Sequence, residues 1–155
     1  MLTNPHPPVA FSFAVRIAGT SGRVDGGFSE VSGLGVEREV AEVAEGGENR
    51  FVHKLPGRVK HENLVLKRGM VTRSSSLFKW CDTILSAPLS RRIDTRNIQV
   101  SLLNERGRPL MVWTASRAWP VKWDVATFDA KASEVAIETM EFAYENLARD
   151  AASGV

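Results

Sequence analysis

The side chains that most often carry chemistry are sparse in this sequence, and their spacing fits no familiar site. The chain has three histidines and one cysteine. His53 and His61 flank a Pro-Gly break at a spacing that matches no metal-ligand motif, and His6 lies in a proline-rich segment. The sequence also lacks the metalloprotease, nucleophile-elbow and phosphate-loop motifs. We therefore expect no catalytic site, no metal and no cofactor.

Three weaker patterns favour structure over chemistry. Gly33-Leu34-Gly35 begins like a dinucleotide-binding fingerprint, but Arg38 stands where the third glycine belongs and a predicted strand follows. Glu134 and Glu138 could pair on one helical face, which is more typical of a solvated surface than of acid–base catalysis. Cys81 lies on the apolar stripe of a predicted helix, so we expect a small core residue rather than a nucleophile.

Composition places the chain among ordinary globular domains. It has 155 residues, 43% hydrophobic and 25% charged, with a formal net charge of +2. These values argue against disorder and give no bulk signal for nucleic-acid or membrane-surface binding. The single cysteine excludes an intrachain disulfide framework. Residues 1–8 lack a secretory pattern and no apolar run is long enough to cross a membrane, so we expect neither a signal peptide nor a transmembrane segment.

Periodicity indicates a mainly β protein with one short helix. A proline-rich segment over residues 1–9 precedes an alternating strand from Phe11 to Ile17. The serines before Leu77 and the i, i+4, i+7, i+8 apolar spacing that follows predict a helix over 74–87, which ends at Pro88. Residues 98–102 and 110–114 alternate like the arms of a hairpin. Residues 148–155 are predicted to be a flexible C-terminus of this single domain.

The segment 36–68 is predicted to be a long hairpin, and its charge is divided between its two arms. Residues 37–48 carry five glutamates against Arg38, whereas residues 50–73 carry seven basic residues against Glu62. Two interpretations are open. Opposite charges can face each other across one antiparallel pair, or an acidic edge and a basic edge can meet on neighbouring subunits.

The segment 133–147 is ambiguous by local pattern. Ile137, Met140, Tyr144 and Leu147 fall at helical spacing, and alanine and glutamate favour a helix. The same segment also fits the alternating faces of a strand. Four tryptophans and the basic residues leave a further possibility open, a β-barrel that binds single-stranded nucleic acid.

Six short motifs, taken in order, resemble the tail tube proteins of contractile phages and of phage-tail-like contractile injection systems. The resemblance covers nearly everything from Phe11 to Leu147. The motifs are Phe28–Leu34, Lys54-Leu55-Pro56-Gly57, Leu66–Gly69, Leu102–Glu105, Ala118-Trp119-Pro120 and Glu134–Glu138.

The resemblance implies an antiparallel β-barrel or sandwich with one packed helix and an extended hairpin arm, distantly similar to the tube protein of type VI secretion. Family subunits form sixfold rings that stack into a hollow tube inside a contractile sheath. The implied partners are therefore other copies of the chain, the sheath, baseplate spike or hub proteins, and cargo or DNA in the lumen. Assembly is expected in the cytoplasm, without membrane insertion and without enzymatic activity.

The resemblance also favours a strand over residues 134–142 and the intersubunit interpretation of the divided charge. The residues expected at subunit interfaces are Glu37, Glu39, Glu42, Arg50, Phe51, Lys54, Arg58 and Lys60. An alternative within the family is a paralogous initiator or adaptor ring between the tube and the baseplate spike.

Overall fold

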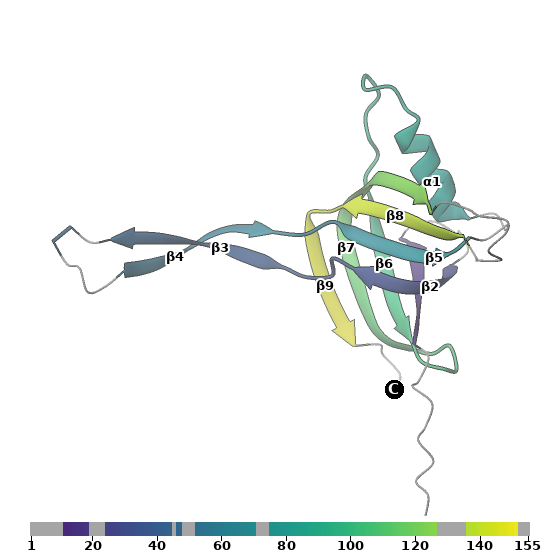
Figure 1. The fold of residues 1–155 in the computed structure, drawn as a ribbon, viewed down its shortest axis with the longest axis horizontal. Helices are drawn as coiled ribbons and strands as arrows, with labels where there is room; N and C mark the ends of the chain where they lie inside the picture. The colour runs from purple at the N-terminus through teal and green to yellow at the C-terminus, as the bar shows by residue number, and fades with distance from the viewer. Residues whose placement is uncertain are drawn as a thin grey trace, which may run out of the picture.

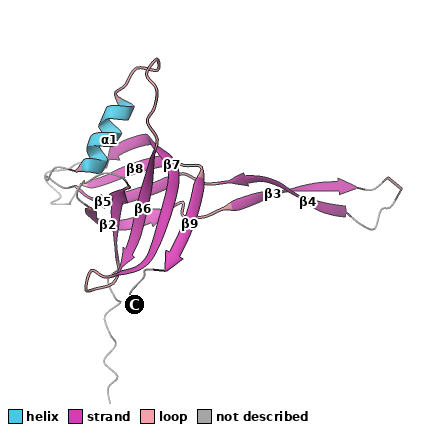
Figure 2. Ribbon diagram, turned by 180° about the vertical axis from the view of Figure 1, so that it is seen from behind, coloured by secondary structure: helices cyan, strands magenta, loops and turns pink. Residues whose placement is uncertain are grey.

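The computed structural model describes residues 11–18, 24–44, 46–47, 52–70, 75–126 and 136–151. Within these ranges the chain forms a β-barrel, a helix packed against it and a two-stranded arm that projects from it (Figures 1 and 2). The predicted mainly β architecture with one short helix is confirmed. The proline-rich segment 1–9 lies outside the described residues.

The barrel is closed by antiparallel pairs throughout. Its strands follow the order β6 (Arg96–Leu103), β1 (Ser12–Ile17), β2 (Asp25–Ser32), β5 (Leu64–Gly69), β8 (Ile137–Ala143) and β7 (Pro109–Val125), and β7 pairs back with β6. The strand prediction for the ambiguous segment is thus confirmed over 137–143. A strand forms there despite the local helical propensity, because Met140 and Phe142 are buried in the barrel core and β5 and β7 provide hydrogen bonds to both edges of β8.

A seventh strand lengthens the sheet beyond the barrel. β9 (Asn146–Ala151) pairs with the first half of β7, so the prediction of a flexible C-terminus is wrong for residues 148–151. Residues 152–155 are outside the described part. β7 changes neighbour from β9 to β8 around Arg117, which has a left-handed φ of 53° and whose N–H donates to the Asn97 side chain. A bulge at this point lets one strand serve both partners.

The helix α1 (Ser76–Leu85) is slightly shorter than the predicted 74–87. Ser75 caps its N-terminus by accepting a hydrogen bond from the Phe78 N–H at 3.1 Å. Trp80 stacks on Phe142 of β8, with ring centroids 5.7 Å apart. Cys81 is fully buried beside them, as predicted for a core residue.

Arg68 of β5 lies inside this core rather than on the arm. Its Nε donates to Glu138 at 2.9 Å, its Nη1 to Asp25 at 3.1 Å and its Nη2 to the Ser75 hydroxyl at 3.1 Å. The guanidinium also lies 4.6 Å from the centre of the Phe28 ring. These contacts tie β2, β5 and β8 to the start of α1.

Candidate assembly arm

The arm consists of β3 (Glu37–Ala44) and β4 (Val52–Lys60), which pair only with each other among the described strands (Figure 1). The predicted hairpin reached residue 68, but in the structure its strands end at Lys60, and Leu64–Gly69 belongs to the barrel. Arg50 and Phe51, expected at the interface, lie outside the described residues. The other six expected residues all lie on the arm, and the register of its strands defines their neighbours.

Both faces of the arm carry exposed apolar side chains. In an antiparallel pair, cross-strand partners share a face and successive residues alternate. Val40, paired with Pro56, therefore lies on one face, and Leu55, paired with Ala41, lies on the other. Five apolar side chains of the arm, and Val36 just before it, are between 46% and 65% exposed; the five are Val40, Val43, Val52, Leu55 and Val59.

Such a ribbon is poorly stable alone in water. A two-stranded hairpin without a covered hydrophobic face is marginal, and burying one aliphatic side chain is worth about 1.5–3 kcal/mol. The geometry of this arm therefore suits coverage of both faces by other molecules.

The divided charge is matched, at least in part, within the chain itself. Lys60 Nζ lies 2.6 Å from a Glu39 carboxylate oxygen and is directly opposite Glu37, while Glu42 is opposite Lys54. The hydrogen bond and the charge of Glu39 raise the pKa of Lys60 above its ordinary value. These pairs correspond to the first interpretation of the sequence. The same residues remain expected contacts with a neighbouring subunit, because five of the six are exposed and Glu39 is half-buried.

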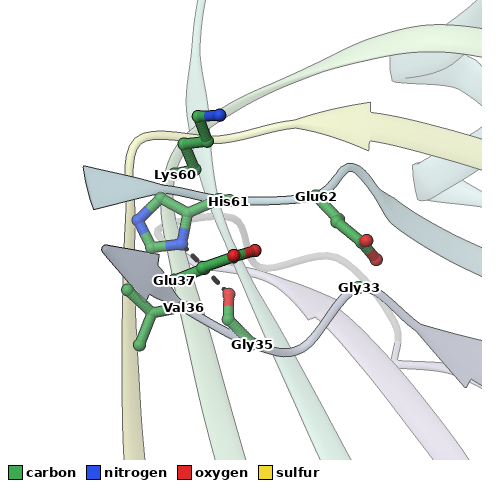
Figure 3. A pocket seen from close by; sticks show the side chains of 7 residues that line it. All are labelled: Gly33, Gly35, Val36, Glu37, Lys60, His61 and Glu62. Carbon is green, nitrogen blue, oxygen red and sulfur yellow. Dashed lines mark hydrogen bonds between the residues drawn. The ribbon is translucent and has the colours of Figure 1, made fainter. Parts of the chain in front are cut away.

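A compact set of contacts joins the root of the arm to the barrel, and Figure 3 shows one of them, the hydrogen bond between His61 and the Gly35 carbonyl. The Tyr144 hydroxyl donates to the Gly33 carbonyl at 2.6 Å and is 3.2 Å from the Gly35 carbonyl. His61 packs on the Tyr144 ring at 4.8 Å, and its Nδ1 lies 3.2 Å from the Gly35 carbonyl. Burial raises the pKa of Tyr144, and the charge of Glu62 adds to this effect, whereas the hydrogen bond to Gly35 opposes it.

The backbone conformation at the root of the arm requires a glycine at position 33. Its φ is +85°, and a Cβ atom there would lie 2.0 Å from the Asn63 carbonyl oxygen. Only glycine can bring the outgoing strand β2 this close to the returning β5 while adopting a left-handed conformation. The root therefore sets the direction in which the arm leaves the barrel.

A cavity of about 430 Å³ opens beside the root, lined by Gly33, Gly35, Val36, Glu37, Lys60, His61 and Glu62 (Figure 3). In the described part of the chain, no group of three or more His, Cys, Asp or Glu residues could hold a metal ion. His61 is engaged with the backbone of the root, so its arrangement is that of a structural residue.

None of the described helices has the length and apolarity to cross a membrane.

β9 offers a second surface for association. One of its edges pairs with β7, and the other carries no strand among the described residues. Free backbone N–H and C=O groups along such an edge can pair with a strand of another molecule.

Comparison with known proteins decides the family. The family described as T4-like virus tail tube protein gp19 matches residues 9–148. This chain belongs to that tail tube family. No curated protein sequence matches it significantly.

Three solved structures are similar to this family member along nearly its whole length. A chain of the anti-feeding prophage baseplate is 32% identical, with a TM-score of 0.72, covering 97% of this chain and 98% of that one. A chain of the sheath–tube complex of the PVC extracellular contractile injection system is 27% identical, with a TM-score of 0.73, covering 96% and 95%. Hcp1 from Salmonella typhimurium, at 12% identity and a TM-score of 0.56 over 92% and 87%, shares the fold.

Two structural features of this tail tube protein differ from what its sequence pattern predicts or are not predicted by it. Arg68 was counted with the basic side of the arm, although Leu64, Leu66 and Arg68 alternate with Val65 and Lys67 and so point to one face of a strand. That alternation could have placed Arg68 in the core. The contact between Tyr144 and Gly33 joins residues 111 positions apart in the chain, and no local sequence pattern predicts it.

Proposed function

We propose that this chain is the main subunit of the inner tube of a contractile injection particle, assembling as stacked hexameric rings. The observation that carries the proposal is the arm, a ribbon with exposed apolar side chains on both faces that is joined to the barrel by the hydrogen bond between Tyr144 and Gly33. Its likeness to chains of tube-containing particles supports the same role. The single domain over residues 1–155 then acts as one repeating unit.

Heterologous contacts explain how such a subunit can form both a ring and a tube. A fixed rotation between neighbours closes a ring, and stacking leaves an open direction of growth. In this proposal each arm is covered by neighbouring copies, which bury the valines on both of its faces. The free edge of β9 pairs with a strand of the adjacent subunit, so that the sheets of a ring become continuous.

Charge on the arm contributes specificity. We expect Glu37, Glu39 and Glu42 to lie near Lys54, Arg58 or Lys60 of another copy, in addition to their pairs within the chain. Arranged in this way, charges fix the register of the contact and exclude wrong partners more than they add affinity.

The remaining roles follow from the tube. The proposed subunit has no enzymatic activity, contacts the contractile sheath on its outside and a baseplate spike or hub protein at one end, and surrounds cargo or DNA in the lumen. Assembly takes place in the cytoplasm.

A second role within the family is favoured by one observation, the similarity to a chain of a baseplate structure. In that case the chain forms an adaptor ring between tube and spike rather than the repeating tube.

Expression of the chain alone, followed by negative-stain electron microscopy, distinguishes these roles. A main tube subunit gives long tubes, whereas an adaptor gives single rings or short stacks. A Val40→Asp/Val59→Asp variant should remain folded and monomeric because both changes lie on exposed arm positions. A chain that forms no rings and shows salt-dependent binding to a single-stranded oligonucleotide would instead be a nucleic-acid-binding barrel.

A further inference from the structure

The connection between β8 and β9 consists of Tyr144 and Glu145 alone, and in both views it lies beside the root of the arm (Figures 1 and 2). Tyr144 is nine-tenths buried, and its hydroxyl donates to the Gly33 carbonyl at 2.6 Å. Its ring packs against His61, which follows directly after β4. One side chain thus contacts both chain segments that join the arm to the barrel.

Glu145 connects the same turn to β7. Its backbone N–H donates to the Ser116 carbonyl at 3.0 Å, and the pairing of β9 with β7 begins at the next residue, Asn146. The Glu145 carboxylate also accepts from Arg117 Nη1 at 2.8 Å, but both side chains are more than half exposed, so this ion pair adds little stability. The buried hydroxyl of Tyr144 is therefore the stronger anchor of the turn.

The arm and β9, which this turn connects, are also elements with uncovered surfaces. β3 and β4 pair with no other described strand, and Val40 and Leu55 are exposed on opposite faces of the arm. Among the described strands, β9 pairs with β7 alone. Elements with few buried contacts open locally at a low cost in free energy. A contact between two such elements links openings that would otherwise be independent.

We propose that the Tyr144–Glu145 turn couples the arm to β9, so that ordering of either element favours the ordered state of the other. While the Tyr144 hydroxyl is bonded to Gly33, the root of the arm and the first residues of β9 are both held. When this bond opens, both elements fray. Coupling of this kind acts equally in both directions.

The coupling is a property of the single chain, whereas its consequence for assembly rests on the proposed tube function. Ordering a segment on binding costs conformational entropy, which weakens association. A neighbour that covers the arm keeps the bond between Tyr144 and Gly33 closed, so β9 is already ordered when a second neighbour pairs with its free edge. Isolated subunits then associate weakly with each other, and the end of a growing tube binds the next subunit more tightly.

Amide hydrogen exchange of the full-length chain tests the coupling, with Val40→Asp/Val59→Asp as the monomeric parent. Tyr144→Phe removes the hydroxyl and keeps the aromatic ring. Exchange should accelerate about two- to tenfold both in residues 36–40 and in residues 146–151, as expected for the loss of one hydrogen bond. Acceleration at the root of the arm with unchanged exchange in β9 would overturn the coupling.

The reciprocal change starts at the far end of β9. Asp150→Pro weakens the pairing of this residue with Val112, away from the turn. It should accelerate exchange in residues 36–40, and it should cause no further acceleration there when Tyr144→Phe is already present. Unchanged exchange in the arm, or equal effects with and without the hydroxyl, would overturn the coupling. If the proline variant does not fold, Ala148→Gly provides a milder weakening of β9.

The matched control is Ile84→Ala in α1. Ile84 is half-buried against the core, so its truncation lowers the global stability without changing the turn between β8 and β9. Exchange in residues 36–40 and 146–151 should match that of the parent. Acceleration similar to that of Tyr144→Phe would mean that exchange there reports global stability, and would contradict the coupling.

Sedimentation of assembled tubes addresses the consequence for assembly. In the otherwise wild-type chain, Tyr144→Phe should raise the protein concentration needed for tubes by about two- to tenfold. An unchanged concentration together with altered exchange would overturn the role of the coupling in assembly. If the wild-type chain forms no tubes at all, the proposed function fails, while the exchange measurements still decide the coupling itself.

Discussion

Arg68 is a charged residue placed where most proteins place an aliphatic one. Removing a guanidinium from water costs several kcal/mol unless ion pairs and hydrogen bonds replace the lost hydration. Asp25 and Glu138 provide two ion pairs, Ser75 accepts a third hydrogen bond, and the Phe28 ring covers the face of the group. Glu138 is held in turn by the Trp123 indole N–H at 2.8 Å.

We predict that Arg68→Met destabilises the subunit by about 3–5 kcal/mol, because Asp25 and Glu138 would remain buried without their counter-ion. Urea unfolding of a non-assembling background, such as Val40→Asp/Val59→Asp, measures the change. The control is Lys67→Met on the same strand, whose amino group lies 3.7 Å from Glu30 at the surface. That change should cost less than about 1 kcal/mol. Equal effects of the two substitutions would contradict a structural role for the buried network.

We predict that the Cys81 thiol does not react with thiol reagents in the folded subunit. Burial, assisted by the charge of Glu138, raises the pKa of its thiol from 9.0 to about 12. A thiol reagent at pH 8 should therefore react only after denaturation, because in the folded subunit the thiol is inaccessible to the reagent and stays protonated.

The same shift predicts a pH dependence of stability. Below pH 9 the thiol is protonated in both the folded and the unfolded state, so it does not make the free energy of unfolding depend on pH. Between pH 9 and about 12 the unfolded thiol loses its proton while the folded one keeps it, and the free energy of unfolding falls as the pH rises. A Cys81→Ala variant should show a shallower decline, as measured by urea unfolding across this range.

At the scale of elements, the arm raises the question of whether its charges act within a subunit or between subunits. We predict that reversing Glu39 and Glu42 to lysine impairs tube formation while the monomer stays folded. A Glu39→Lys/Lys60→Glu swap restores the pair of residues 39 and 60, both within the chain and between copies. Recovery of tubes by the swap would show that this one pair is sufficient, whereas continued failure would assign Glu39 to a different basic residue of a neighbouring copy, such as Lys54 or Arg58. Electron microscopy and circular dichroism supply the measurements.

The root of the arm can be tested through two glycines of one loop. Gly33→Ala should destabilise the subunit by more than about 2 kcal/mol, because it combines a left-handed φ with a Cβ that collides with the Asn63 backbone. Gly35→Ala meets nothing within 4 Å and has no such φ, so it should change stability by less than about 0.5 kcal/mol. Thermal unfolding of both variants provides the comparison, and an unaffected Gly33→Ala variant would refute the account of the root.

At the scale of the whole molecule, stability and assembly should be linked. Association that occurs only in the folded state stabilises that state by mass action. We predict that the unfolding temperature of the wild-type protein rises with protein concentration, whereas that of Val40→Asp/Val59→Asp does not. Differential scanning calorimetry over a wide concentration range measures both. Identical, concentration-independent curves would mean that the arm contributes nothing to assembly.

The sequence by itself determined the β-rich class, the short helix with Cys81 inside it, the existence of the arm and the tail tube family. These features are encoded by alternation, capping residues and ordered motifs, which are local in the chain. Local pattern could not place residues 137–143, where propensity favours a helix although a strand also fits, nor could it reveal that residues 148–151 form a strand.

Only the tertiary structure decided those points, together with the burial of Arg68, the root contact of Tyr144 with Gly33 and the pairing of Glu39 with Lys60. Each depends on partners distant in the sequence: a strand on either edge, a carboxylate on another element, or a backbone that leaves no room for a Cβ. The alternating pattern of β5 could have identified the buried face, but only the folded barrel supplied the charges that make an arginine stable there.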